Sequence, residues 1–243
     1  MINYFKAEWR KTKKAQIILI GILFIALSSF IGLGNYFLNR QILIDGTQSE
    51  IMWGQLTFYY SQILFPPMIG IMVAISLMPE FDRKTIEMLR ANNVSIRNML
   101  FGKLLSMIIL LIPLQLSLLV IFFCSMKVDN ISVMGEMLVH LKWVLVSIIG
   151  AIPLICIQLF ITAKSNSFSQ SVGISAIGAI GGFVLLFLNE SLNKLYPFSF
   201  TMIALRSRIL IDFTSIELIF FIGISVLYSI FFFRICEKSL LKK

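Results

Sequence analysis

The most constraining feature of this 243-residue chain is a series of uncharged stretches, each long enough to approach the span of a lipid bilayer. The six stretches are Ala15–Asn39, Ile51–Pro79, Leu104–Met126, Trp143–Ala163, Ser165–Asn189 and Leu218–Phe233. A transmembrane α-helix needs about 20 apolar residues, and a charge at its centre costs about 2.5–3.5 kcal/mol. Only 14% of the residues are charged, against about 25% in soluble domains. The sequence therefore predicts an all-α, polytopic membrane protein with six transmembrane helices.

The first and last stretches need separate arguments. Ala15–Asn39 is longer than the apolar core of a signal peptide, which has about 7–15 residues, and no small-residue cleavage site follows it. We therefore interpret it as a permanent helix. Leu218–Phe233 has only 16 residues, so it spans a bilayer only if Glu217 and Arg234 reach the two membrane surfaces.

The positions of the basic residues predict how the chain is oriented. With six spans, both termini lie on one side, and 15 of the 21 lysines and arginines fall on that side. Because cytoplasmic loops are enriched in Lys and Arg, we expect both termini in the cytoplasm. The net charge of +9 is thus mainly a topology signal, with attraction to anionic membrane lipid as a second effect. It does not indicate a nucleic-acid partner.

Two segments outside these stretches are expected to have structure of their own. Residues 1–14 place Phe5 and Trp9 on one helical stripe among lysines and arginines, which favours an amphipathic helix in the membrane interface. The alternative is a basic flank that only orients the first span. Residues 190–217 form a long outer segment before the sixth helix, and we expect Phe200–Leu205 to dip into the outer interface as a helix.

Signatures of catalysis, metal binding and nucleotide binding are missing from the sequence. His140 is the single histidine and is interpreted as an interfacial residue, and the three cysteines lack metal-ligand spacing. There is no GxxxxGK[ST] motif, and no acidic residue lies within the six stretches to relay protons or sodium. We therefore expect no catalytic residue, metal site or bound cofactor in a single transmembrane domain of residues 1–243. A secondary carrier or membrane-embedded enzyme is disfavoured by these absences, and a non-transporting anchor or sensor is a further alternative.

Small residues line one face of the fifth predicted helix. Ser171, Ser175, Gly178 and Gly182 lie close together there, and the two glycines have the GxxxG spacing that allows close helix approach. Packing is the simplest interpretation, whether within the chain or across a dimer. The wall of a substrate path is the alternative.

The most informative connection is residues 80–92, which follow the second predicted helix. Pro79 is expected to end that helix and to start a short new one. Glu80 then falls in the first turn and Arg90 in the last, each at the end that the helix dipole favours. The result is a short charged helix at the cytoplasmic surface or, alternatively, a solvated connector.

Side-chain spacing gives this short predicted helix two faces. Arg83 and Glu87 are four residues apart and can form an ion pair. The less polar face consists of Phe81, Thr85, Met88 and Leu89, and Asn92-Asn93 marks the end of the helix.

The same segment carries a resemblance to a known family. A glutamate leaves the second helix, a threonine follows, and a short spacer separates Glu87-Met88-Leu89-Arg90 from Gly102-Lys103. This pattern resembles the signature loop of ABC-2 type permeases. The tract from Trp53-Gly54-Gln55-Leu56 through Phe65-Pro66-Pro67 is similar to permease subunits of lantibiotic-immunity and related antimicrobial-peptide exporters. Lys84 stands where the family pattern often has glycine.

The resemblance implies a fold, partners and a mechanism. It implies a type V exporter-like transmembrane domain in a bacterial cytoplasmic membrane, paired with a second permease chain, identical or paralogous. Two copies of a separate ABC ATPase subunit would use ATP and magnesium, and the cargo would be a lantibiotic, another antimicrobial peptide or a lipophilic molecule. An ABC-2 permease for another lipophilic cargo or a drug is the alternative. The residues implied to contact the ATPase are Glu80, Arg83, Thr85, Glu87, Leu89 and Arg90.

Overall fold

The computed structural model describes residues 2–44, 46–82, 85–92, 95–132 and 135–241, and this part of the chain is helical with no β-strand. Six helices among the described residues are long and apolar enough to cross a membrane, which confirms the predicted number. The second of them is one continuous helix with three named parts. The six are α2 (Lys14–Leu38), α3–η2–α4 (Gln48–Phe58, Tyr59–Leu64 and Phe65–Asp82), α6 (Ile96–Val128), α7 (Glu136–Ser165), α8 (Phe168–Leu188) and α11 (Ser215–Leu241).

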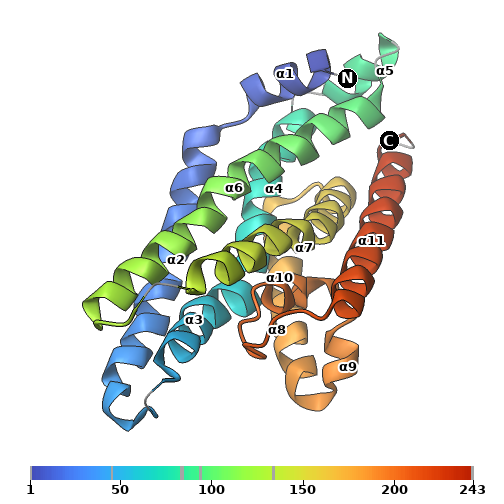
Figure 1. The fold of residues 1–243 in the computed structure, drawn as a ribbon. Helices are drawn as coiled ribbons and strands as arrows, with labels where there is room; N and C mark the ends of the chain where they lie inside the picture. Colours follow the sequence, from blue (N-terminus) through green and yellow to red (C-terminus); the bar gives the residue numbers. More distant parts are fainter. Residues whose placement is uncertain (1, 45, 83–84, 93–94, 133–134, 242–243) are drawn as a thin grey trace.

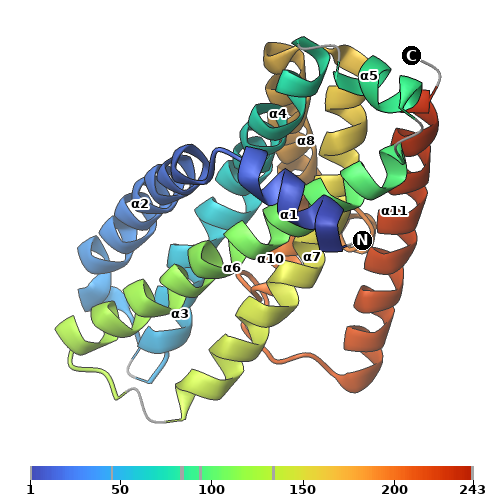
Figure 2. The ribbon, with the colours of Figure 1, turned by 90° about the horizontal axis from the view of Figure 1, so that it is seen from above.

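Short helices occupy the connections. They are α1 (Ile2–Lys11), η1 (Arg40–Ile42), α5 (Thr85–Ala91), α9 (Glu190–Asn193), η3 (Pro197–Ser199) and α10 (Phe200–Ala204). Figure 1 shows α1, α5 and the C-terminal part of α11 at one end of the bundle, which we call the loop end. The helix α9 lies toward the opposite end, which we call the distal end. In Figure 2, α1 lies across α6, against which it packs.

Four of the membrane-spanning helices, the second span, α6, α7 and α11, extend beyond their uncharged stretches at both ends because their end turns carry polar residues. The helix α11 has 27 residues, where the uncharged stretch had 16. The second span is also longer than predicted, because Pro79 does not end it and α4 continues to Asp82. The prediction that Glu80 begins a new helix is therefore wrong. A proline removes its own hydrogen-bond donor and crowds the carbonyl four residues earlier, but neighbouring helices in a membrane protein can satisfy the backbone that it frees.

The middle of the second span is irregular. Tyr59–Leu64 is a π-helix directly before Pro66 and Pro67, whose rings carry no N–H to donate to the carbonyls of that turn. Contacts with α8 hold this region in place. Ser175 Oγ donates to the carbonyl of Pro66, and Gln62 Nε2 donates to a carbonyl of α8 at 3.2 Å.

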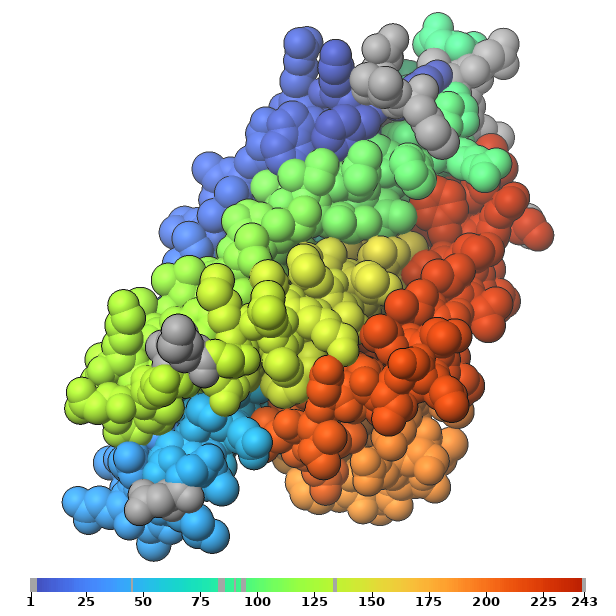
Figure 3. Space-filling view, in the orientation of Figure 1, coloured from blue at the N-terminus to red at the C-terminus, as the bar shows by residue number. Residues whose placement is uncertain are grey.

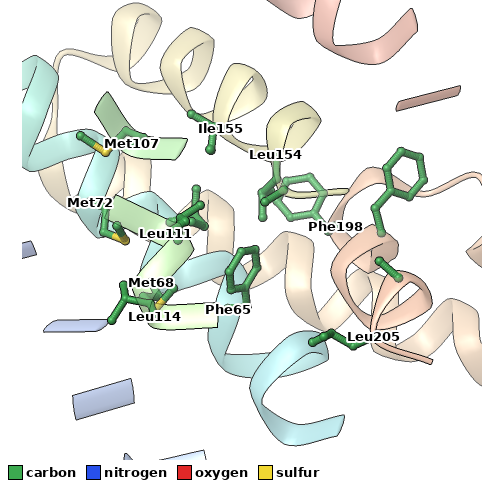
Figure 4. Packing of buried hydrophobic residues seen from close by; sticks show 14 of the residues in the cluster. Phe65, Met68, Met72, Met107, Leu111, Leu114, Leu154, Ile155, Phe198 and Leu205 are labelled. Atoms are coloured by element: carbon green, nitrogen blue, oxygen red, sulfur yellow. The ribbon is translucent and has the colours of Figure 1, made fainter. Parts of the chain in front are cut away.

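The hydrophobic core lies where α4, α6 and α7 meet. Figure 4 shows its central side chains, which are Phe65, Met68, Met72, Met107, Leu111, Leu114, Leu154 and Ile155, with Phe198 and Leu205 beside them. By contrast, α2, α8 and α11 carry large apolar side chains on the outside. Phe30 is 81% exposed, Ile177 is 69% exposed and Ile216 is 83% exposed. Apolar surface of this extent on long helices suits contact with lipid.

The helices α7 and α8 form a hairpin through a very short turn. Asn166 ends α7 in the left-handed conformation, with φ of 50°, which asparagine adopts more readily than most residues. Ser167 then begins α8, and its Oγ accepts a hydrogen bond from the backbone N–H of Gln170 at 3.4 Å. These two residues explain how two spans follow one another with almost no connection.

The segment between α8 and α11 closes the distal end. Part of it is helical as predicted, and Phe200–Ala204 is buried against α7. Arg206 donates to Glu217 through hydrogen bonds of 2.9 and 2.6 Å, and Trp53 Nε1 donates to the carbonyl of Leu205 at 2.7 Å. The segment is thus tied both to α3 and to the start of α11.

His140 lies near the start of α7 as predicted, but it is enclosed within the protein and not exposed on its surface. The rings of Trp53, Phe122 and Trp143 lie around it at centroid distances of 4.6, 4.6 and 4.9 Å. These rings come from three different helices, α3, α6 and α7. The pattern along one helix cannot reveal such an enclosure.

Candidate coupling site

The short helix α5 lies at the loop end and contacts both α4 and α6. One side of it is anchored, because Ile86 is 5% exposed and Leu89 packs against the hydrophobic core. Glu87 and Met88 are exposed. The helix ends where the backbone N–H and the side-chain amide of Asn92 donate to the carbonyl of Met88, at 3.1 and 2.8 Å. The helix α5 is therefore seated on the bundle and offers its other side to the surroundings.

The buried side of α5 differs from the predicted one. Ile86 is the best-buried of the described side chains of α5, although the prediction did not include it, whereas Met88 is 61% exposed and Phe81 belongs to α4. The reason is the register of the helix. Because α5 begins at Thr85 and not at Pro79, a different set of residues faces the bundle.

The residues predicted to contact an ATPase are only partly described. Glu87 is exposed on α5, and Leu89 is half-buried there. Outside the described part of the chain lie Arg83, Lys84 and Asn93, together with the side chains of Thr85 and Arg90, whose backbone belongs to α5.

Glu80, the remaining predicted residue, is buried in the last turn of α4 and pairs with Lys103 of α6. Lys103 Nζ donates to Glu80 Oε1 at 2.9 Å and to the carbonyl of Ser76 at 2.9 Å. The side chain of Lys103 is 2% exposed and that of Glu80 is 5% exposed. This ion pair joins the two helices that flank α5.

The same lysine binds α1. Lys103 Nζ lies 2.7 Å from Glu8 Oε2, and Lys11 Nζ lies 3.1 Å from Glu8 Oε1. Lys11 Nζ also lies 3.4 Å from Glu80 Oε1. We call this group the basal cluster (Glu8, Lys11, Glu80 and Lys103). Its two positive and two negative charges balance.

A glycine allows α1 to approach α6 this closely. A Cβ atom on Gly102 would lie 3.0 Å from Cγ of Glu8 and 3.3 Å from the carbonyl oxygen of Tyr4, both tight contacts. Thr12 Oγ1 donates to the carbonyl of Glu8 at 2.8 Å, where α1 ends. Gly102 and Lys103 therefore act together, since the glycine makes room for α1 and the lysine binds it.

The electrostatics of the basal cluster favour a rigid connection. Although partial burial lowers the pKa of Lys11, the carboxylates of Glu8 and Glu80 outweigh this effect and raise that pKa above its ordinary value. Lys11 is therefore charged at neutral pH. A buried ion pair adds little net stability, but removing one partner typically costs about 3–5 kcal/mol, because the other charge is left uncompensated.

Sequence reasoning identifies half of this cluster. Glu80 and Lys103 belong to the segment that resembles a known family, whereas Glu8 and Lys11 are interpreted only as parts of an interfacial helix. The available signal is Glu8, because it is the sole acidic residue among the first 44 residues. A single acid in a strongly basic segment suggests a specific cationic partner, although the sequence does not say which one.

The small residues of α8 face the interior of the chain. Ser171, Ser175, Gly178 and Gly182 are buried, and α8 packs against α4, α7 and η3. A Cβ atom on Gly178 would overlap the ring of Phe198. Contacts within the chain therefore fill this stripe.

Groups that could bind a metal do not gather in the described residues. No set of three or more His, Cys, Asp or Glu side chains in residues 2–44, 46–82, 85–92, 95–132 and 135–241 could hold a metal ion. Cys156 and Cys236 are buried, Cys124 is exposed, and all three are free thiols.

Comparison with known proteins identifies one family. The family described as ABC-2 family transporter protein matches residues 4–182, a range that includes α5 and the whole basal cluster. No curated protein and no solved structure matches the chain.

Proposed function

This chain belongs to the ABC-2 family of transporter proteins, and we propose that it is the membrane-spanning permease subunit of an ATP-driven exporter. Members of this family are membrane subunits of transporters, and a separate partner generally hydrolyses the ATP. Two copies of an ABC ATPase subunit bind at the loop end in this proposal and use ATP and magnesium. A second permease chain, identical or paralogous, completes the membrane domain.

The observation that carries this proposal is the way in which α5 is attached to α4 and α6. It is an exposed short helix whose two neighbours, α4 and α6, are joined by the ion pair of Glu80 with Lys103. In the proposed mechanism, closure of the ATPase pair moves α5, and the basal cluster passes the movement to α4, α6 and α1 together. Transmission of this kind requires contacts that differ between two states and a connection that does not yield. Glu87, Arg83, Thr85, Leu89 and Arg90 are the proposed ATPase contacts.

Glu80 has a different role in this proposal. Because it is buried between Lys103 and Lys11, we assign it to transmission within the chain and not to the contact surface.

The proposed orientation places both termini and α5 in the cytoplasm of a bacterium whose plasma membrane holds the six spans. Two observations support it. Most lysines and arginines lie at the side that holds the termini, and such residues favour the cytoplasmic side. The termini and α5 also lie at one end of the bundle (Figure 1).

We propose a lantibiotic or another antimicrobial peptide as the cargo, with a different lipophilic molecule or a drug as the alternative. Support comes from the sequence resemblance and from a groove toward the distal end. The rings of Phe58 and Tyr59 line this groove together with the amides of Asn35 and Gln55. Apolar walls with a few hydrogen-bonding groups are what an amphipathic molecule requires.

The test is a charge reversal on α5. Glu87→Lys changes an exposed residue, so the chain should insert in the membrane in normal amounts. If Glu87 pairs with a cation of the ATPase, losing that pair should cost about 2–5 kcal/mol of binding, which weakens it by about 30-fold or more. ATPase recovered with the purified chain and the peptide tolerance of the cell should then both fall.

Glu190→Lys is the matched control for this test. It makes the same charge change on the short helix α9 toward the distal end, where Glu190 is exposed and only 3.8 Å from Lys194. This control should leave ATPase recovery and tolerance unchanged. Equal ATPase recovery from wild type and Glu87→Lys would contradict the proposed contact. A chain that never co-purifies with an ATPase would instead favour the secondary carrier.

A further inference from the structure

A second feature of the loop end is a groove between α6, α7 and α11. These three helices lie side by side on the face shown in Figure 3, with α6 in green, α7 in yellow and α11 in red. Its lining includes Arg97, Phe101 and Leu104 of α6, and Ile230, Phe233 and Arg234 of α11. No member of this set belongs to α5 or to the basal cluster.

The groove has a charged mouth and an apolar floor. On α6, Arg97, Phe101 and Leu104 follow the spacing of one helical face, with the arginine in the first turn at the loop end. The helix α11 runs in the opposite direction, toward the loop end, so Arg234 lies nearer to that end than Ile230. Both helices therefore place a guanidinium at the same end of the groove and apolar side chains deeper in the bundle.

The two arginines have no partner for their charge within the described chain. Both are exposed, and neither forms an ion pair with another described residue. At this end Glu8 and Glu80 are occupied by Lys11 and Lys103, and Asp82, Glu87 and Glu237, which also lie there, form no ion pair with either arginine among the described residues. Two uncompensated cations above an apolar groove attract an anion that has an apolar part.

We propose that this groove binds an anionic phospholipid from the leaflet at the loop end. Its phosphate lies between Arg97 and Arg234, whose planar guanidinium groups match phosphate oxygens in pairs. One acyl chain lies along Phe101, Leu104 and Ile230, parallel to the helices. Basic pockets between transmembrane helices are suited to anionic head groups. A free phosphate or nucleotide would leave the apolar part of the groove unfilled.

This lipid would contact the most exposed of the six spans. Only 11% of the most apolar window of α11 is buried, the lowest share among the six spans. Its main partner is α7, and the groove lies along its seam with α6. A lipid bound in that seam would join α11 to α6 and make the position of α11 dependent on the composition of the membrane.

Photocrosslinking in vesicles tests the proposal on the full-length chain in its purified assembly. Two diazirine-bearing probes are compared, a phosphatidylglycerol and a phosphatidylcholine with the same acyl chains, and the labelled residues are mapped by mass spectrometry. The phosphatidylglycerol probe should label the segments around Phe101, Leu104 and Ile230, and the phosphatidylcholine probe should label them far less. Replacing both arginines, in Arg97→Gln/Arg234→Gln, should reduce this labelling by about 25-fold, about fivefold for each charge.

Two further variants make the result specific. Arg10→Gln/Lys238→Gln removes the same charge from exposed residues of α1 and α11 that do not line the groove, and it should retain the labelling. Arg97→Lys/Arg234→Lys keeps the charge but not the paired donors, so it should lose less labelling than the glutamine variant, which separates lipid binding from a folding defect. Equal labelling by the two probes, equal loss in the control variant, or crosslinks to another protein chain in this groove would overturn the proposal. Competition by inorganic phosphate alone would assign the arginines to a soluble anion and would also overturn it.

Discussion

The basal cluster makes a quantitative prediction about α1. In Lys103→Met the new side chain has a similar length but no charge, so Glu8 and Glu80 lose the cation between them. The carboxylate of Glu8 can regain water only if α1 leaves α6. The substitution should therefore lower the free energy needed to detach α1 from α6. This decrease should be larger than that for any other helix.

The magnitude follows from burial. Removing one partner of a buried ion pair costs about 3–5 kcal/mol. Lys11 remains near both carboxylates, but its side chain is 48% exposed, so it compensates for only part of the loss. We therefore expect a cost of about 3 kcal/mol, which corresponds to an open population of α1 about 150 times larger.

Amide hydrogen exchange of the purified chain measures this opening directly. Exchange of the α1 amides in Lys103→Met should accelerate by about 150-fold. Lys142→Met is the matched control, since Lys142 pairs with Asp212 at 2.8 Å, but the two side chains are 40% and 44% exposed. That exposed pair should contribute no more than about 1 kcal/mol. In this control, hydrogen bonds from Trp143 and from the backbone N–H of Phe213 continue to hold Asp212.

A double substitution separates the ion pair from general damage to packing. In Glu8→Gln/Lys103→Met the unpaired carboxylate of Glu8 is removed together with the lysine. The two changes should therefore cost less together than the sum of the single changes, by about 1–3 kcal/mol, as coupled neighbours do. Additive effects, or unchanged exchange of α1 in Lys103→Met, would refute the reasoning that the cluster fixes α1.

Two further predictions concern topology and packing. In a cysteine-free background, a membrane-impermeant maleimide applied to intact cells should label Ile44→Cys, since Ile44 is 76% exposed. The same reagent should not label Asn92→Cys at the end of α5. The reverse pattern would invert the topology. Gly178→Ala should lower thermal stability by about 1–3 kcal/mol, because the new Cβ meets the buried Phe198 ring. Gly173→Ala on the same helix is the control, since a Cβ there has open space. Equal melting temperatures of the two variants would contradict this packing.

The six spans could be predicted because exclusion of charge is a local property of the sequence. Each uncharged stretch can be recognised without knowing which helices pack against it. The helix ends were harder to place, since α4 passes through Pro79 and α11 includes Glu217, which the distal segment neutralises through Arg206. Such ends depend on partners that lie elsewhere in the fold, and no window of sequence contains them.

The basal cluster shows a second limit of sequence reasoning. Glu8 and Lys103 are 95 positions apart, and they meet only because α1 turns back over α6 at Gly102. Helical periodicity correctly predicts that residues near the N-terminus form a helix. It cannot predict that the single acid of this helix is buried against a lysine, because the burial is created by the other element.

The structure also separates two ways in which the proposed coupling can fail. The helix α5 is held by Ile86 and the half-buried Leu89, and burial of one such side chain contributes about 1.5–3 kcal/mol. When moving α5 costs less free energy than exposing these side chains, α5 stays attached and its movement passes to α4 and α6. This requires that the pair of Glu80 with Lys103 keeps the two helices together. Glu87→Lys should thus reduce both ATPase recovery and transport. Lys103→Met should leave ATPase recovery unchanged and reduce transport alone, since the contact surface persists while the connection behind it yields. If both variants lose the ATPase to the same extent, the basal cluster belongs to the contact surface and the assigned division of roles is wrong.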